Sequence, residues 1–322
     1  MKKITLRYIL PLLFTVLILY IFLLRKTPPA DIFAAFSKLS GMTLLVFAGL
    51  TLLATVLRAW RYRILLDGRL SFGDLLLITL VRNFSVDLLP ARSAALLLYS
   101  YFTRKKGIKL EEGASSFVIS MFYDTLALGL MLSGLLLFAA GTLKAGVYIP
   151  AAFLILALSG AVIFLSLPAL KLLNRLPWLQ KRKKPRDILQ AVTDYLQKRR
   201  TSGERWLVFG LSLVIRALKY VSLFLLFRNL VPVEFNLEAF SDFTFGLAAT
   251  ELSALIPIQG LAGIGTWETV FSLVFSHIAP PLENPFLVGL VIHLTTQVWE
   301  YSLGIAAFLY LSFQKKKEIG LS

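Results

Sequence analysis

The stretch LVRNFSVDLLPARSAALLLYSYF, residues 80–102, interrupts a chain that is otherwise strongly apolar. Its charged and amide side chains and its one proline are Arg82, Asn83, Asp87, Pro90 and Arg92. Charged side chains are costly in a bilayer and face the interior of a bundle or a wet cavity. A proline ends or kinks a helix. The stretch is therefore not an ordinary membrane span.

Basic clusters flank this stretch on both sides, at 58–69 and at 104–112. Loops rich in lysine and arginine stay in the cytoplasm, so a single crossing would leave one cluster on the wrong side. The two arms, 74–89 and 91–103, are also too short as helices to cross ~30 Å of hydrocarbon. The stretch therefore predicts a re-entrant hairpin that enters from the cytoplasm.

The composition sets the broad class. Of the residues, 57% are hydrophobic and only 16% are charged, against about a quarter charged in a soluble domain. The chain has no cysteine, which excludes disulfides, thiolate metal sites and a cysteine nucleophile, and no metal or nucleotide motif is present. Apolar runs long enough to cross the bilayer occupy 6–24, 41–57, 113–141, 147–168, 206–231 and 286–312.

A second interrupted region covers residues 240–279. Its middle reads PIQGLAGIGTWE, residues 257–268, and its flanks carry glutamates without lysine or arginine. We interpret it as a second hairpin that enters from outside. Most of the 34 lysines and arginines then fall in cytoplasmic segments, with both termini inside.

This topology predicts an all-α polytopic membrane protein with six full spans and two re-entrant hairpins. The whole chain, 1–322, forms one integral membrane domain. It contains two repeats of inverted topology, at about 41–141 and 206–312, and a basic cytoplasmic loop at 171–205. Inverted repeats with broken helices are typical of transporters, whose site lies near the midplane where the hairpin tips meet.

Polar side chains recur at helical spacing within the predicted spans and hairpins. The candidate substrate-binding residues are Arg82, Asn83, Asp87, Arg92, Asp124, Arg216, Lys219, Glu251, Gln259, Thr266, Glu268, His293, Gln297 and Glu300. Arginines and the helix N-termini expected at the hairpin tips favour an anion such as a phosphate head group. The carboxylates would neutralise the arginines or relay protons. The alternative is that these stripes join helices, with Arg216 paired to Glu300 or Asp124.

Within the loop 171–205, the segment RDILQAVTDYLQKRR, residues 186–200, places apolar residues on one helical face. It resembles an amphipathic helix that lies on anionic lipids of the inner leaflet. Positive-inside bias alone is the alternative explanation for its charge. We expect no nucleic-acid partner, no metal and no cofactor, and the oligomeric state stays open.

Three stretches resemble the lysylphosphatidylglycerol synthase transmembrane region, a flippase-like family. They are residues 58–113, the segment VISMFYDTLAL at 118–128, and LIPIQGLAGIGTWETVFSL at 255–273. The positions that match the family's motifs are Asn83, Pro90, Arg92, Asp124, Gly260, Gly263, Gly265 and Glu268. Two positions depart from the pattern: Ala94-Ala95 replaces Gly-Glu, and Ser120-Met121 replaces Glu-Arg.

The resemblance implies a prokaryotic plasma membrane protein without the family's soluble synthase domain. Our leading hypothesis is a flippase or transporter, and not an enzyme. It would move a phosphate-bearing lipid, such as an aminoacylated phospholipid or a polyprenyl-phosphate lipid, between leaflets. A membrane-embedded head-group or sugar transferase, with Asp124 or Glu268 as base, is one alternative. A non-transporting partner subunit is the other, supported by the departures at Ala95 and Met121.

Overall fold

The computed structural model describes residues 28–86, 88, 93–139, 183–198, 203–255, 261–278 and 282–314. The predicted spans 6–24 and 147–168 lie outside these residues. Every regular element in the described ranges is helical, which confirms the all-α class. The long helices are α3 (Gly41–Leu65), α6 (Leu110–Ala139), α10 (Gly203–Leu230) and α13 (Pro285–Phe313).

Three of these helices, α3, α6 and α10, are long and apolar enough to cross a membrane. Helix α13 has 29 residues, or about 44 Å at the rise of an α-helix. It is therefore also long enough to cross, but a polar stripe through its middle makes it less apolar. Helix α3 continues past the predicted end of the span at residue 57, and this extension places two arginines inside the bundle.

Four shorter helices stand between the long ones. They are α4 (Phe72–Phe84), α5 (Ser93–Lys105), α11 (Leu237–Glu251) and α12 (Thr266–Ile278). Each has 13 or 15 residues, about 20 Å of helix. Side chains cap two of them: Ser71 accepts from the Asp74 amide and Asn236 from the Ala239 amide, as short polar side chains do at helix starts.

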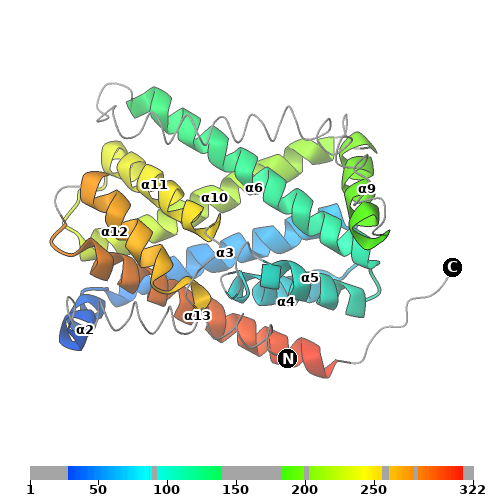
Figure 1. The fold of residues 1–322 in the computed structure, drawn as a ribbon, viewed down its shortest axis with the longest axis horizontal. Coiled ribbons are helices and arrows are strands. Elements are labelled where there is room, and N and C mark those ends of the chain that lie inside the picture. The colour runs from blue at the N-terminus through cyan, green and yellow to red at the C-terminus, as the bar shows by residue number, and fades with distance from the viewer. Residues whose placement is uncertain are drawn as a thin grey trace.

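The helices form two units with the same order and the same internal contacts. In the first unit α3 contacts α4, α4 contacts α5, and α6 contacts both α5 and α3. In the second unit α10, α11, α12 and α13 repeat this pattern. Between the units α3 lies along α10, α4 contacts α13, and α11 contacts α6. Figure 1 shows the pair α4 and α5 and the pair α11 and α12 toward opposite ends of the bundle.

Hydrogen bonds identify which helix ends lie together. At one end, Lys105 donates through Nζ to the backbone carbonyls of Leu311 and Ser312, at 2.8 and 2.9 Å. At the other end, the Asn229 side-chain oxygen accepts from the Ser40 amide at 3.2 Å and from Thr43 Oγ1 at 3.1 Å. The ends of α5 and α13 therefore lie together at the first end, where Lys106 also pairs with Asp74 at the start of α4. The start of α3 and the end of α10 lie together at the other end, where α11 follows α10 and α12 precedes α13 in the chain.

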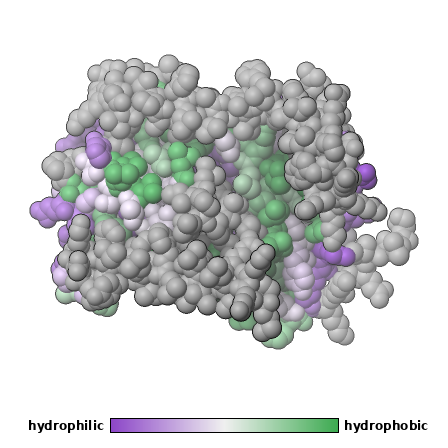
Figure 2. Space-filling view, in the orientation of Figure 1, coloured by the Kyte–Doolittle hydropathy of each residue, from purple (hydrophilic) through white to green (hydrophobic). Residues whose placement is uncertain are grey.

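Two aromatic clusters hold the units together. The first surrounds Tyr62 and Tyr99, and the second stacks Phe271 on Phe275 with ring centroids 4.0 Å apart. Gly304 lets α13 approach α4 closely, because an added Cβ would lie 2.9 Å from the Leu80 carbonyl oxygen. Among the residues coloured in Figure 2, hydrophobic ones fill the middle and hydrophilic ones gather toward the two ends, as a membrane protein requires.

Helix α9 (Lys183–Lys198) is the amphipathic helix that the sequence predicts. It packs against α6, where Thr193 is buried and Ser115 donates to the Ile188 carbonyl at 3.4 Å. One side of this helix therefore covers protein. Its contact with anionic lipids stays a prediction.

Candidate functional site

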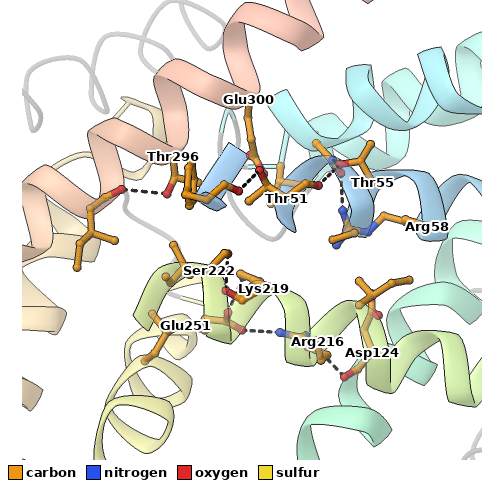
Figure 3. A pocket seen from close by; sticks show the side chains of 18 of the residues that line it. Thr51, Thr55, Arg58, Asp124, Arg216, Lys219, Ser222, Glu251, Thr296 and Glu300 are labelled. Carbon is orange, nitrogen blue, oxygen red and sulfur yellow. Dashed lines mark hydrogen bonds and ion pairs between the residues drawn. The ribbon is translucent and has the colours of Figure 1, made fainter. Parts of the chain in front are cut away.

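A polar cavity of about 170 Å³ lies where the short helices end between the long ones. Helices α3, α4, α6, α10, α11, α12 and α13 all contribute to its wall. Figure 3 shows polar side chains of α3 and α10 facing each other across it. The charged residues of the wall are Arg58, Arg82, Asp124, Arg216, Lys219, Glu251 and Glu300. The cavity therefore brings the end of α4 together with the end of α11 and the start of α12.

In the corner between α3 and α4, two arginine side chains donate to the same amide oxygen. Arg58 Nη1 and Arg82 Nη1 both donate to Asn83 Oδ1, at 3.0 and 3.1 Å. The Asn83 amide nitrogen donates to Thr55 Oγ1 at 3.1 Å, which fixes the orientation of the amide. Neither arginine has a carboxylate partner among the residues that the structure describes.

The corner between α10 and α11 is a compact group of charges. Glu251, the last residue of α11, accepts from Arg216 Nη1 at 2.9 Å and from Lys219 Nζ at 2.6 Å. Arg216 Nε also donates to the backbone carbonyl of Asp124, at 3.2 Å. One carboxylate is thus shared by two cations, and it joins α11 to the middle of α10.

The corner between α12 and α13 contains a buried carboxylate and imidazole. Glu268 Oε1 lies 2.5 Å from His293 Nδ1, and its second oxygen accepts from the Gly265 amide at 2.6 Å. Gln297 Nε2 donates to the Ala262 carbonyl and to His293 Nε2. Because His293 Nε2 accepts, Nδ1 carries the ring proton and donates to Glu268. The helix start at Gly265 is thereby tied to α13.

Beside the cavity, Arg61 forms a buried ion pair with Asp124. Its side chain is 0% exposed, and it holds Asp124 through two hydrogen bonds of 2.5 and 3.1 Å. It also donates to Ser120 Oγ and Ser212 Oγ, each at 2.7 Å. This network joins α3, α6 and α10, and it neutralises the carboxylate of Asp124.

The structure brings most of the predicted site residues together. The predicted residues that line the cavity are Arg82, Asn83, Asp124, Arg216, Lys219, Glu251, His293 and Glu300. Glu268 and Gln297 are buried behind them, against His293. Thr266 is buried at the start of α12. Asp87, Arg92 and Gln259 lie outside the described residues.

Two arginines of this region are not predicted from the sequence. Arg58 and Arg61 are expected in a cytoplasmic loop, but both lie within α3 and point into the bundle. The signal was available: Thr51, Thr55 and Arg58 recur at a spacing of three to four residues, which places them on one helical face. Arg216 pairs with Glu251 rather than with Glu300 or the Asp124 side chain, the alternatives weighed from sequence.

The two departures from the family pattern have structural accounts. Ala94 and Ala95 are buried near the start of α5, with Ala95 in the first aromatic cluster. Ser120 takes part in the network of Arg61 and donates to Tyr62 at 3.2 Å. The two alanines are therefore packed in the core, and Ser120 is hydrogen-bonded.

The family model of the lysylphosphatidylglycerol synthase TM region matches residues 8–303. This range covers most of the chain, and the protein belongs to that family. A comparison with curated proteins finds no match.

Proposed function

We propose that this member of the lysylphosphatidylglycerol synthase TM region family moves a phosphate-bearing lipid, aminoacylated or polyprenyl-linked, between the leaflets of a membrane. The observation that supports it is the charged cavity between the long helices, which the ends of α4 and α11 and the start of α12 reach. Charges at such depth in membrane proteins mark a substrate or ion path. A lipid head group would occupy the cavity while its acyl chains stay in the bilayer.

The proposed membrane arrangement has six crossings and two re-entrant hairpins. Helices α3, α6, α10 and α13 cross together with the predicted spans 6–24 and 147–168. Helices α4 and α5 form one hairpin, and α11 and α12 form the other. Their length of about 20 Å is too short for ~30 Å of hydrocarbon, and the inner ends of α4 and α11 reach the cavity. The matching contacts of the two units support an inverted repeat.

We place the basic end of the bundle in the cytoplasm of a prokaryotic plasma membrane. Exposed basic residues at this end include Arg69, Arg104 and Lys109, whereas Glu234 and Glu283 lie at the other end. This distribution follows the positive-inside rule. Both termini are then cytoplasmic.

Single cysteines test this arrangement, because the chain has no cysteine of its own. Arg69→Cys and Lys109→Cys flank the first hairpin, and Glu234→Cys and Glu283→Cys flank the second. A membrane-impermeant maleimide applied to intact cells should label only the second pair. Labelling of one member of a pair without the other would show a crossing and overturn the hairpin.

The contacts of the acidic residues support transport rather than bond-making. Asp124 is held by Arg61, Glu251 by two cations, and Glu268 by His293 and a backbone amide. A carboxylate oxygen that already accepts a hydrogen bond has less room to take a proton from a substrate. These side chains are suited to balancing a charged head group.

The function is tested in vesicles that contain the purified protein. Fluorescent phosphatidylglycerol, lysyl-phosphatidylglycerol or a polyprenyl phosphate is placed in both leaflets, and dithionite bleaches the outer one. Translocation should raise the bleached fraction above one half, and protein-free vesicles serve as control. If no lipid class moves, the proposed function fails. New lipid products formed by the protein would instead favour the transferase hypothesis.

A further inference from the structure

We propose that Arg58 and Arg82 form the phosphate-binding subsite of the cavity, with Asn83 holding the two guanidinium groups together. The inference rests on the proposed function and deepens it, because it assigns the anionic part of the lipid to one corner. The other interior cations, Arg61, Arg216 and Lys219, balance the protein's own carboxylates.

The hydrogen bonds of the two arginines carry the proposal. Each guanidinium has five N–H donors, yet among the described side chains both share the single oxygen of Asn83. The Nε atoms of Arg58 and Arg82 are buried without a partner. Arg82 is only 5% exposed and lines the cavity. Arg61 Nε is buried in the same way, so the distinguishing observation is that Arg58 and Arg82 both line the cavity while their side-chain hydrogen bonds among the described residues end only on a neutral amide.

Three carboxylates line the cavity, those of Asp124, Glu251 and Glu300. Among the described residues no ion pair joins any of them to Arg58 or Arg82, so this corner favours an anion. Arg61 already binds both oxygens of Asp124. Glu251 is bound by Arg216 and Lys219. In the part of the chain that the structure describes, no carboxylate bonds to Arg58 or Arg82. A buried cation without a counter-charge is strongly unfavourable, and a bound phosphate would supply that charge.

The corner is also organised before an anion arrives. Thr55 accepts from the Asn83 amide nitrogen and donates to the Thr51 carbonyl at 2.9 Å, so the amide oxygen faces the arginines. The Arg82 guanidinium lies over the Phe117 ring at 5.6 Å from its centroid. Fixed guanidinium planes suit a tetrahedral oxyanion, which arginine binds through two parallel hydrogen bonds.

Binding of short-chain lipids to the purified full chain in a non-ionic detergent tests the subsite without any translocation. The probes are dioctanoyl-phosphatidylglycerol, glycerol 3-phosphate as a water-soluble phosphate, and dioctanoylglycerol as a lipid without phosphate. Variants Arg58→Gln and Arg82→Gln each remove one guanidinium. Arg228→Gln, at an exposed position near the end of α10, is the matched control.

We expect saturable binding of the phospholipid, and each of the two variants should weaken it roughly tenfold or more, as loss of a charge-assisted hydrogen bond does. Arg228→Gln should bind like wild type, and dioctanoylglycerol should not bind saturably. Arg82→Lys should lie between wild type and Arg82→Gln, because it keeps the charge without the planar fork. Wild-type affinity in both glutamine variants would overturn the subsite, even where translocation in vesicles is intact.

Glycerol 3-phosphate distinguishes the phosphate-binding subsite from the proposal that the ligand is a lipid. If glycerol 3-phosphate binds as tightly as the phospholipid and depends on the same arginines, the anion subsite stands and the lipid assignment fails. Stability of the ligand-free protein is a second readout. Arg82→Gln should leave its thermal midpoint unchanged or higher and should abolish the rise caused by the phospholipid. A lower midpoint with the lipid effect retained would show that Arg82 is structural only.

Discussion

Replacing Asp124 by asparagine should destabilise the protein strongly, because it removes the charge against which Arg61 is buried. Arg61 is 0% exposed, and the side chain of Asp124 is 7% exposed. Two of the four hydrogen bonds of the guanidinium end on this carboxylate, and the other two end on neutral serines. Asparagine is close in shape, so the substitution changes charge and donor pattern rather than volume.

The magnitude follows from this geometry. Removing one partner of a buried ion pair costs about 3–5 kcal/mol, because the remaining charge stays uncompensated. This is a third or more of the stability of many proteins, about 5–15 kcal/mol. Glu112→Gln provides the control, since its partner Arg69 is 2.8 Å away and the two side chains are 44% and 34% exposed. Loss of this exposed pair should cost about 1 kcal/mol or less.

The assay is denaturant-induced unfolding in mild detergent, followed by tryptophan fluorescence. The double variant Arg61→Met/Asp124→Leu should be more stable than Asp124→Asn, because apolar side chains replace a buried ion pair at little cost. Ser212 and Ser120 keep partners in that variant, through the Val208 carbonyl and the Tyr62 hydroxyl. Equal destabilisation by Asp124→Asn and Glu112→Gln would refute the reasoning.

Three further substitutions test the packing and the cavity. Gly304→Ala should cost about 1–3 kcal/mol of unfolding free energy through overpacking against Phe84, whereas Gly134→Ala, with open space around it, should be neutral or stabilising. Glu251→Gln leaves two α10 cations without their carboxylate and should slow lipid translocation in vesicles at least tenfold; an unchanged rate would exclude a role for this ion pair. Glu268→Gln should cost about 1–3 kcal/mol and raise amide hydrogen exchange at 261–270, which unchanged exchange would contradict.

The features that depend on local composition could be predicted from the sequence. Apolar runs and their lengths indicate the membrane class and four of the long helices, because hydrocarbon thickness sets a minimum length. Proline, glycine and polar residues within the two remaining apolar regions predict two pairs of short helices. Helical spacing places His293, Gln297 and Glu300 on one face of the last helix. In the structure His293 and Glu300 line the cavity, and Gln297 contacts His293.

The partners of the charged residues depended on tertiary structure. An arginine at the end of an apolar run looks the same in sequence whether it lies in a loop or inside a helix bundle. Arg58 and Arg61 were assigned to the cytoplasm because their compensating groups, Asn83 and Asp124, come 25 and 63 residues later in the chain. Only the packing of α3 against α4, α6 and α10 shows that Asp124 neutralises Arg61, whereas Arg58 contacts a neutral amide. The sequence by itself therefore determined most of the polar side chains within the membrane, and the fold added Arg58 and Arg61 and decided which charges balance one another.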